Sequence, residues 1–166
     1  YKYNYNNGQG STYTHYFYND LQYIINKFGY QWCKKDKTII VENMRELILR
    51  DDDCFELTQG TRRFLELTKR IQVMLAVVPG NIKFNLVSLI KKYLNVTVVQ
   101  HGWKHINNAD KGKPKFEKFD SLDILTGKGM LESLFKNQFY PCFVPPWNKF
   151  DGDYKLLYDM EFKKVS

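Results

Sequence analysis

Three consecutive carboxylates, Asp51, Asp52 and Asp53, follow a short apolar run of the sequence. Adjacent carboxylates repel one another, and the repulsion lowers stability unless a cation or a set of hydrogen-bond donors offsets it. One interpretation of this acidic run is therefore a cation site. The alternative is a cluster at the start of a helix, where aspartate is favoured as a capping residue.

Two of the three histidines, His101 and His105, stand four residues apart. This spacing predicts that both imidazoles project from one side of a helical turn. Zinc binds imidazole nitrogen at about 2.0–2.1 Å, and one aspartate with two histidines is a donor set that leaves a position open for water. The histidine pair and the acidic run together therefore predict a catalytic zinc site. Two unrelated histidines are the alternative.

The third distinctive segment reads Phe-Val-Pro-Pro-Trp-Asn over residues 143–148. Two successive prolines favour an extended backbone, which can hold Trp147 rigidly. A rigid aromatic ring suits contact with the face of a sugar, so this segment predicts one wall of a substrate site. The alternative is an ordinary turn that ends a strand and places its tryptophan in the core.

The elements that would position these segments follow from hydrophobic patterning. Short apolar runs rich in β-branched residues predict strands, and apolar residues at helical spacing predict helices. The predicted strands are residues 38–41, 47–49, 73–78, 96–99 and 139–144, with a further strand beginning in 162–165. The predicted helices are residues 61–70, 82–94, 127–137 and 153–161, with a long polar segment at 107–120.

Alternating strands and helices predict an α/β protein with a parallel sheet that helices cover. Active sites of such proteins lie beyond the carboxyl ends of the strands. The acidic run follows the first strong strand at 47–49, His101 follows the strand at 96–99, and the Pro-Pro pair follows the strand at 139–144. We therefore expect the three segments to meet at one edge of the sheet.

Length and composition exclude several classes of protein. The 166 residues predict one domain, and a hydrophobic fraction of 43% is too high for a wholly disordered chain. No apolar run approaches the roughly 18–20 residues of a membrane span. The net charge of +7 comes from scattered basic residues, so no nucleic-acid partner is expected. The three cysteines match neither a disulfide framework nor a CxxC metal pair.

The N-terminal part has a different composition. Residues 1–20 are rich in tyrosine and asparagine and poor in aliphatic side chains, and residues 21–32 show helical spacing with a stop at Gly29. We therefore interpret residues 1–36 as a loop or an upstream extension, and residues 37–166 as the α/β domain. The unpaired cysteines and the lack of a visible signal peptide favour the cytoplasm as the location.

In this order, residues 50–53, 100–107 and 143–148 resemble the motifs of the polysaccharide deacetylase (NodB-homology) family. The closest likeness is to a subgroup with an RDDD, QHGxxHxN and FVPPWN signature. The resemblance covers roughly residues 45–166. It implies a distorted (β/α) barrel that uses a divalent metal, usually zinc, to hydrolyse N- or O-acetyl groups on a glycan or oligosaccharide.

The resemblance also implies roles for particular residues. Asp52 would be the catalytic base. The metal ligands would be Asp53, His101 and His105. The substrate contacts would be Pro145, Trp147 and Asn148. The triple aspartate leaves two registers open for the base and the ligand, Asp51 with Asp52 or Asp52 with Asp53, and the spacing after Arg50 favours the second.

The chain departs from the family pattern at three points. Val144 stands where the family often has an arginine that orients the base, and Arg50 is a candidate replacement. No histidine follows His105 to act as the general acid. A full barrel needs about 200–250 residues, so the barrel would be incomplete in this chain.

These departures leave alternatives open. We expect a sequence that is truncated at its C-terminus, although a diverged inactive protein or an obligate partner chain would also account for the departures. The expected function is metal-dependent deacetylation of a carbohydrate, with poor activity for the 166 residues alone. The alternatives are a catalytically impaired glycan-binding relative of the same fold and a different metal hydrolase on a similar barrel.

Overall fold

The computed structural model describes residues 31–33, 38–40 and 49–166 of the chain. The chain divides into two compact units, residues 1–46 and residues 47–166. The boundary between the units thus falls after residue 46, whereas the sequence suggested a boundary after residue 36.

A short hairpin belongs to the first unit. Strand β1 (Gln31–Cys33) pairs antiparallel with strand β2 (Thr38–Ile40). The strand predicted at 38–41 is therefore present, but its partner is β1 and not a strand of the parallel sheet. The helix expected to end near Gly29 lies outside the described residues.

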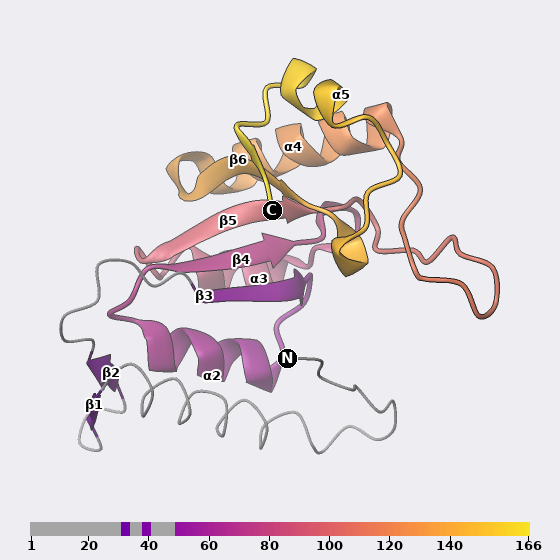
Figure 1. Ribbon diagram of the computed structural model, residues 1–166. Helices are drawn as coiled ribbons and strands as arrows, with labels where there is room; N and C mark the ends of the chain where they lie inside the picture. Colours follow the sequence, from indigo (N-terminus) through magenta and orange to yellow (C-terminus); the bar gives the residue numbers. More distant parts are fainter. Residues whose placement is uncertain (1–30, 34–37, 41–48) are drawn as a thin grey trace. The chain divides into compact units, whose positions relative to one another are not determined.

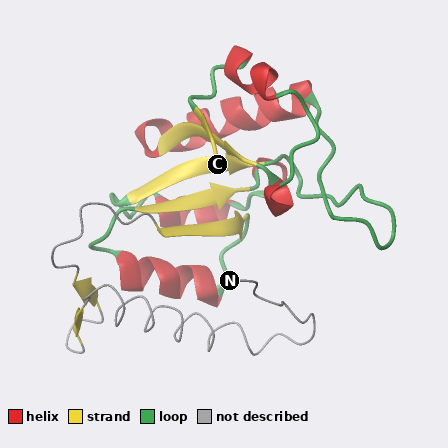
Figure 2. Ribbon diagram, viewed as in Figure 1, coloured by secondary structure: helices red, strands yellow, loops and turns green. Residues whose placement is uncertain are grey.

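Five parallel strands form one sheet in the second unit (Figures 1 and 2). They are β3 (Leu49–Cys54), β4 (Val73–Val77), β5 (Val96–His101), β6 (Phe139–Val144) and β7 (Lys164–Val165). The strands lie side by side in the order in which they occur along the chain. This confirms the predicted α/β class with a parallel sheet. Within the described residues the sheet is open, with β3 and β7 at its two ends.

Helices and short 3₁₀ turns connect these strands. The α-helices are α2 (Gln59–Thr68), α3 (Phe84–Ile90), α4 (Ser121–Phe135) and α5 (Tyr154–Asp159). The 3₁₀ turns are η1 (Pro79–Asn81), η2 (Lys136–Gln138) and η3 (Pro146–Asn148). Every predicted helix of this unit is present, with different ends.

Capping side chains explain where two of the helices begin. The Thr58 hydroxyl accepts a hydrogen bond from the Thr61 N–H at 3.0 Å, so α2 begins at residue 59 and not at residue 61. The Asp120 carboxylate caps α4, which therefore begins six residues before the predicted start at 127. Hydrophobic spacing alone does not reveal such polar first turns.

The central strands are buried along most of their length. Leu75, Ala76 and Val77 of β4 have no exposed surface, as parallel strands covered on both faces require. One apolar cluster joins β4, β5 and β6 through Ala76, Val99, Cys142 and Val144. A second joins β6 to the helical layer through Ile124, Phe143, Leu157 and Phe162. These clusters hold the carboxyl ends of the strands in fixed positions.

The acidic run does not follow a strand, as the sequence suggested, because Asp51, Asp52 and Asp53 lie inside β3. Strand β3 stands at one end of the sheet, where charged side chains can reach water. Its pairing with β4 shifts register between Asp51 and Cys54. A register shift of this kind changes the direction in which a side chain points, and here it affects the side chain of Asp53.

One contact links the two ends of the sheet. Arg50 Nη1 of β3 donates a hydrogen bond to the Ser166 hydroxyl at 2.8 Å, and Ser166 directly follows β7. The Ser166 N–H in turn donates to the Phe143 carbonyl of β6 at 3.0 Å. The five strands therefore curve enough for a side chain of β3 to reach the segment after β7.

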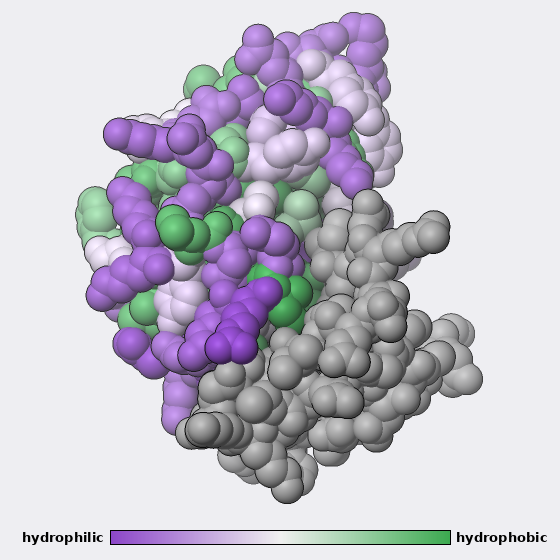
Figure 3. Space-filling view, turned by 90° about the vertical axis from the view of Figure 1, so that its left-hand side faces the viewer, coloured by the Kyte–Doolittle hydropathy of each residue, from purple (hydrophilic) through white to green (hydrophobic). Residues whose placement is uncertain are grey.

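On the coloured part of the face that Figure 3 shows, hydrophilic and hydrophobic areas are interspersed. Among the described residues, no helix has the length and apolar character that a membrane span requires. Cys54 and Cys142 are buried free thiols.

Candidate metal site

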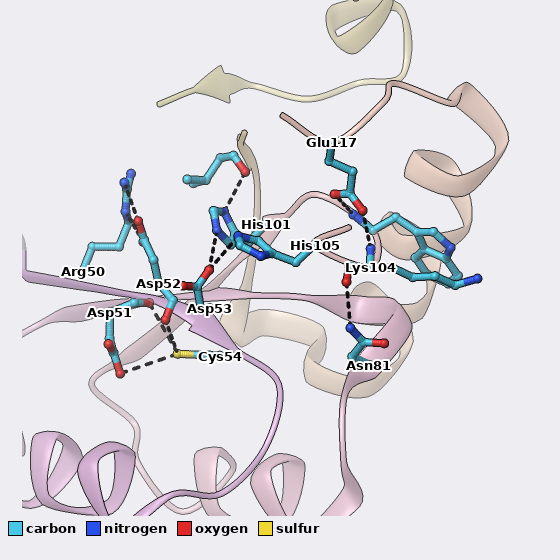
Figure 4. A network of polar contacts seen from close by, with 12 residues as sticks. Arg50, Asp51, Asp52, Asp53, Cys54, Asn81, His101, Lys104, His105 and Glu117 are labelled. Carbon is cyan, nitrogen blue, oxygen red and sulfur yellow. Dashed lines mark hydrogen bonds and ion pairs between the residues drawn. The ribbon is translucent and has the colours of Figure 1, made fainter. Parts of the chain in front are cut away.

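Three potential metal ligands meet at the carboxyl edge of the sheet (Figure 4). Asp53 comes from β3, His101 is the last residue of β5, and His105 lies in the loop that follows β5. Their ligand atoms all lie within 4.8 Å of one another. The structure thus brings together the three residues that the sequence suggested as ligands.

One carboxylate oxygen faces both imidazoles. Asp53 Oδ1 lies 3.0 Å from His101 Nε2 and 2.8 Å from His105 Nε2. The two imidazole rings have centroids 5.0 Å apart. The Asp53 side chain is 60% exposed while that of His101 is only 3% exposed, so the cluster opens to solvent on the side of the carboxylate.

The histidines do not share a helical turn, which corrects the expectation from their spacing. His101 ends a strand, and residues 102–106 form an irregular loop that brings His105 back beside it. The loop turns sharply because Gly102 and His105 both have left-handed backbones, with φ of 60° and 57°. The spacing correctly grouped the two side chains, but by a different backbone path.

Left-handed backbones recur at the site. Of the six described non-glycine residues with positive φ, four belong to the three motifs. They are Asp53, His105, Trp147 and Asn148. Each such conformation costs about 1–2 kcal/mol and persists only where surrounding contacts hold it. Strain of this kind concentrates at functional sites, which supports a role for this edge of the sheet.

A backbone contact sets the tautomer of His101. His101 Nδ1 lies 2.9 Å from the Val144 carbonyl oxygen, which can only accept a hydrogen bond. Nδ1 therefore carries a proton. In a neutral His101, the other nitrogen Nε2 then presents a lone pair, as a metal ligand must.

That lone pair points at a second acceptor. His101 Nε2 faces Asp53 Oδ1 at 3.0 Å, and an imidazole lone pair beside a carboxylate oxygen is repulsive without a proton or a cation between them. When the two Nε2 atoms carry protons, their hydrogen bonds to Asp53 hold the pKa of its carboxyl well below its usual range, so the carboxylate is ionised. A divalent cation at this position would take the place of those protons. The donor set therefore fits a divalent cation such as zinc.

Asp52 lies beside this cluster and takes a different partner. Arg50 Nε contacts Asp52 Oδ1 at 2.6 Å and Arg50 Nη2 contacts Oδ2 at 3.0 Å, which is a two-point ion pair. In Figure 4 the Asp52 side chain lies on the same side of the strand as His101. Arg50, the residue that the sequence suggested for orienting the base, is therefore the partner of Asp52.

Asp51 points the opposite way, toward Cys54 (Figure 4). The Cys54 thiol lies 3.6 Å from Asp51 Oδ2. Burial raises the pKa of Asp51 to about 6, and the negative charges of Asp52 and Asp53 add to the shift while the Cys54 contact opposes it. The geometry therefore groups Asp53, and neither of the other two aspartates, with the imidazoles.

An aromatic ring flanks the cluster. The Trp147 ring packs against His105 with centroids 4.2 Å apart and a tilt of 43°. Of the other two predicted substrate contacts, Asn148 is exposed and Pro145 is buried. Only Pro145 has the extended backbone expected for the Pro-Pro pair, since Pro146 begins η3. The structure therefore places Trp147 at the site, exposes Asn148 and encloses Pro145.

Sequence reasoning missed two polar residues around the loop that carries His105. The Glu117 carboxylate accepts hydrogen bonds from loop N–H groups, and Asn81 Nδ2 donates to the Lys104 carbonyl at 2.8 Å. Asn81 lies in a turn and Glu117 lies in a lysine-rich polar segment. Neither position carries a spacing signal, because the contacts join residues distant in sequence.

No known protein-family model matches this sequence, and no curated protein matches it either. The candidate functional site therefore rests on the cluster of Asp53, His101 and His105, together with the hydrogen bonds that orient these side chains.

Proposed function

We propose that this protein is a metal-dependent hydrolase that removes acetyl groups from a carbohydrate. The observation that carries the proposal is the convergence of Asp53 Oδ1 with the Nε2 atoms of His101 and His105. The resemblance of the three motifs to polysaccharide deacetylases supplies the reaction and the substrate class. Two imidazoles and one carboxylate with an open position are a donor set that catalytic zinc sites use.

We further propose that the sheet is part of a distorted (β/α) barrel. Its five parallel strands follow one another in chain order, as barrel strands do. A doubly wound sheet would reverse that order at a switch point. The hydrogen bond between Arg50 and Ser166 supports strong curvature of the sheet.

In the proposed site, Asp53, His101 and His105 hold the cation. A zinc ion held by these residues would supply Lewis-acid chemistry, which lowers the pKa of water and stabilises negative charge on an acyl oxygen. The Val144 carbonyl keeps His101 in the tautomer that leaves Nε2 free to coordinate. The ionised Asp53 supplies the negative charge that favours a divalent cation.

Asp52 is the proposed general base. Its carboxylate accepts a proton from the attacking water, while the fork of Arg50 fixes its orientation. The water oxygen bonds to the acetyl carbon, the bond from that carbon to the sugar nitrogen or oxygen breaks, and acetate leaves. The departing amine or hydroxyl must gain a proton, which Asp52 can return after the attack.

Trp147 is the proposed wall for the sugar ring. It lies directly on His105, so a glycan stacked against it would sit beside the cation ligands. An apolar face of a pyranose ring packs well on an aromatic ring, and the tryptophan N–H can still find a polar partner. Asn148 is exposed next to it and offers an amide for sugar hydroxyls.

One observation favours the second candidate, a glycan-binding relative with impaired catalysis. The Trp147 ring packs on His105 and offers an aromatic surface for a sugar that depends neither on a bound cation nor on a general acid. In this second candidate Trp147 still binds sugar, while hydrolysis is slow or absent. Binding and acetate release therefore have to be measured separately.

The test begins with metal content. The protein is stripped with a chelator and reloaded with zinc, and zinc is quantified per chain. Acetate release is then measured on N-acetylated chitooligosaccharides and on O-acetylated xylan, alongside sugar binding. One zinc per chain with zinc-dependent acetate release is the expected result, and sugar binding without acetate release would favour the second candidate.

Asp53→Asn and Asp159→Asn form a matched pair for this test. Asp53→Asn removes a ligand charge and is expected to lose both zinc and acetate release. Asp159→Asn removes a surface carboxylate of α5 that pairs with Lys155, and is expected to retain both. No stoichiometric zinc in the wild-type chain would contradict the proposed function.

A further inference from the structure

We infer that Glu117 is a positioning residue, whose carboxylate holds the loop of residues 102–106 in the conformation that turns His105 toward Asp53. The inference rests on the proposed metal site and deepens it. Glu117 touches neither the proposed ligand atoms nor the reacting groups, so any effect on metal binding has to pass through the loop.

The Glu117 carboxylate accepts three backbone hydrogen bonds from this loop. Oε2 accepts from the Trp103 N–H at 2.9 Å, and Oε1 accepts from the Lys104 N–H at 2.7 Å and, at a longer 3.4 Å, from the Ile106 N–H. Lys104 and Ile106 are the neighbours of His105 along the chain. One oxygen therefore bridges the two peptide N–H groups that flank the proposed ligand.

His105 needs such support because of its backbone. Its φ of 57° is a left-handed conformation that a non-glycine residue adopts only where neighbouring contacts favour it. Without Glu117, three N–H groups would lose their partner and would favour loop conformations in which they find another. Most of those conformations would turn His105 away from Asp53.

The opposite side of the loop is held by η1. The Gly80 N–H donates to the Trp103 carbonyl at 2.8 Å, and Asn81 Nδ2 donates to the Lys104 carbonyl at 2.8 Å (Figure 4). Lys104 therefore has its N–H bound on one side and its C=O bound on the other. The bonds from η1 fix where the loop lies, and Glu117 fixes the backbone conformation on both sides of His105.

Close packing shows how tightly the carboxylate fits. A Cβ atom built on Gly102 would overlap Glu117 Oε2 and would lie 2.5 Å from Pro146 Cγ. The carboxylate thus occupies the space next to the glycine, between the loop and the Pro-Pro turn. Such a carboxylate has little freedom to move, which suits a group that supports a ligand from outside the metal site.

The test compares Glu117→Ala and Glu117→Gln with the wild-type chain. Zinc affinity is measured by competition with a chromophoric chelator, and the visible spectrum of the cobalt-substituted protein reports ligand geometry. Loss of an outer contact of a metal ligand lowers metal affinity by about 10–100-fold. We expect that loss for Glu117→Ala, together with a changed cobalt spectrum.

The zinc affinity of Glu117→Gln is expected to lie between that of Glu117→Ala and that of the wild type. The amide oxygen can still accept from Lys104 and Ile106, but the amide nitrogen would face the Trp103 N–H, which is also a donor. This partial rescue separates positioning from a general loss of stability. Glu117→Gln also carries the test if the alanine variant does not fold at the assay temperature.

Glu66→Gln is the matched control, because the Glu66 carboxylate on α2 accepts a hydrogen bond from the Tyr93 hydroxyl. It should bind zinc as the wild type does. Folded Glu117 variants with wild-type affinity and spectrum would overturn this inference alone and leave the metal site standing. A wild-type chain that binds no zinc would overturn the proposed function, and the inference with it.

Discussion

His101 donates its Nδ1–H to the carbonyl oxygen of Val144, the last residue of the neighbouring strand β6, over 2.9 Å. This single contact decides which nitrogen of His101 faces the carboxylate of Asp53. It also ties the histidine motif to the Pro-Pro motif, since Val144 directly precedes Pro145. A motif identified by its residue types is thus held in place by a backbone atom of another motif.

Zinc should stabilise the folded protein through this cluster. Binding at a free zinc concentration of about 100 times Kd stabilises the folded state by about 2.7 kcal/mol. For a chain of this size that corresponds to a rise in Tm of roughly 5–10 °C, measurable by differential scanning fluorimetry. The rise should be absent in Asp53→Asn and preserved in Asp159→Asn. An equal rise in all three proteins would place zinc elsewhere.

Two glycine substitutions should separate backbone strain from steric overlap. Gly112 has φ of 82° with no atom within 4 Å of a built Cβ, so Gly112→Ala should cost only about 1–2 kcal/mol of unfolding free energy for the left-handed backbone. Gly102→Ala adds overlap with Glu117 and Pro146 and should cost about 1–3 kcal/mol more. Urea unfolding measures both.

The same pair of variants also bears on the site. Gly102→Ala should weaken zinc binding by at least about tenfold, because it displaces the carboxylate that supports the His105 loop. Gly112→Ala should bind zinc normally. Equal stability and equal zinc affinity for the two variants would contradict the packing described around Gly102.

Arg50→Lys should lower turnover without removing the metal. Lysine keeps the positive charge but cannot form the two-point contact with Asp52, so the base would lose its fixed orientation. We expect kcat for acetate release to fall by about tenfold, with KM and zinc affinity within about twofold of the wild type. Steady-state kinetics and chelator competition measure these quantities.

Ser166→Ala is the control for that variant, because it removes only the other contact of Arg50. It should leave kcat unchanged. If Arg50→Lys lost zinc as well as activity, Arg50 would support the ligand cluster rather than the base.

Asp51→Asn should stabilise the metal-free protein above pH 6. The pKa of Asp51 rises from 3.8 to about 6 on folding, so its stabilising contribution is full below pH 3.8 and is lost as the pH rises through about 6. Asparagine carries no charge to bury. We expect a gain of about 1–2 kcal/mol at pH 8, since the half-buried carboxylate keeps part of its hydration.

Urea unfolding in the presence of a chelator, at pH 4 and pH 8, measures this effect. The difference between Asp51→Asn and the wild type should be small at pH 4 and larger at pH 8. A variant that is less stable than the wild type at pH 8 would show that ionised Asp51 is favourable in the folded state.

Local sequence determined the strands that consist of continuous apolar runs. The strand predicted at 139–144 is β6 without a change of ends, and the strand predicted at 73–78 is β4 with one residue fewer. Such runs favour strands that are buried on both faces, as in a parallel sheet covered by helices. The residue types of the candidate site, aspartate and two histidines, were equally visible in the sequence.

Tertiary structure decided how those residues meet. The register shift in β3 turned Asp53, and not Asp51, toward the imidazoles, and an irregular loop replaced the helical turn expected for His105. Both depend on partners far along the chain, β4 for Asp53 and Glu117 for His105. Hydrophobic periodicity reports which residues are buried, but left-handed backbones and strand bulges arise from hydrogen bonds that only the folded chain can form.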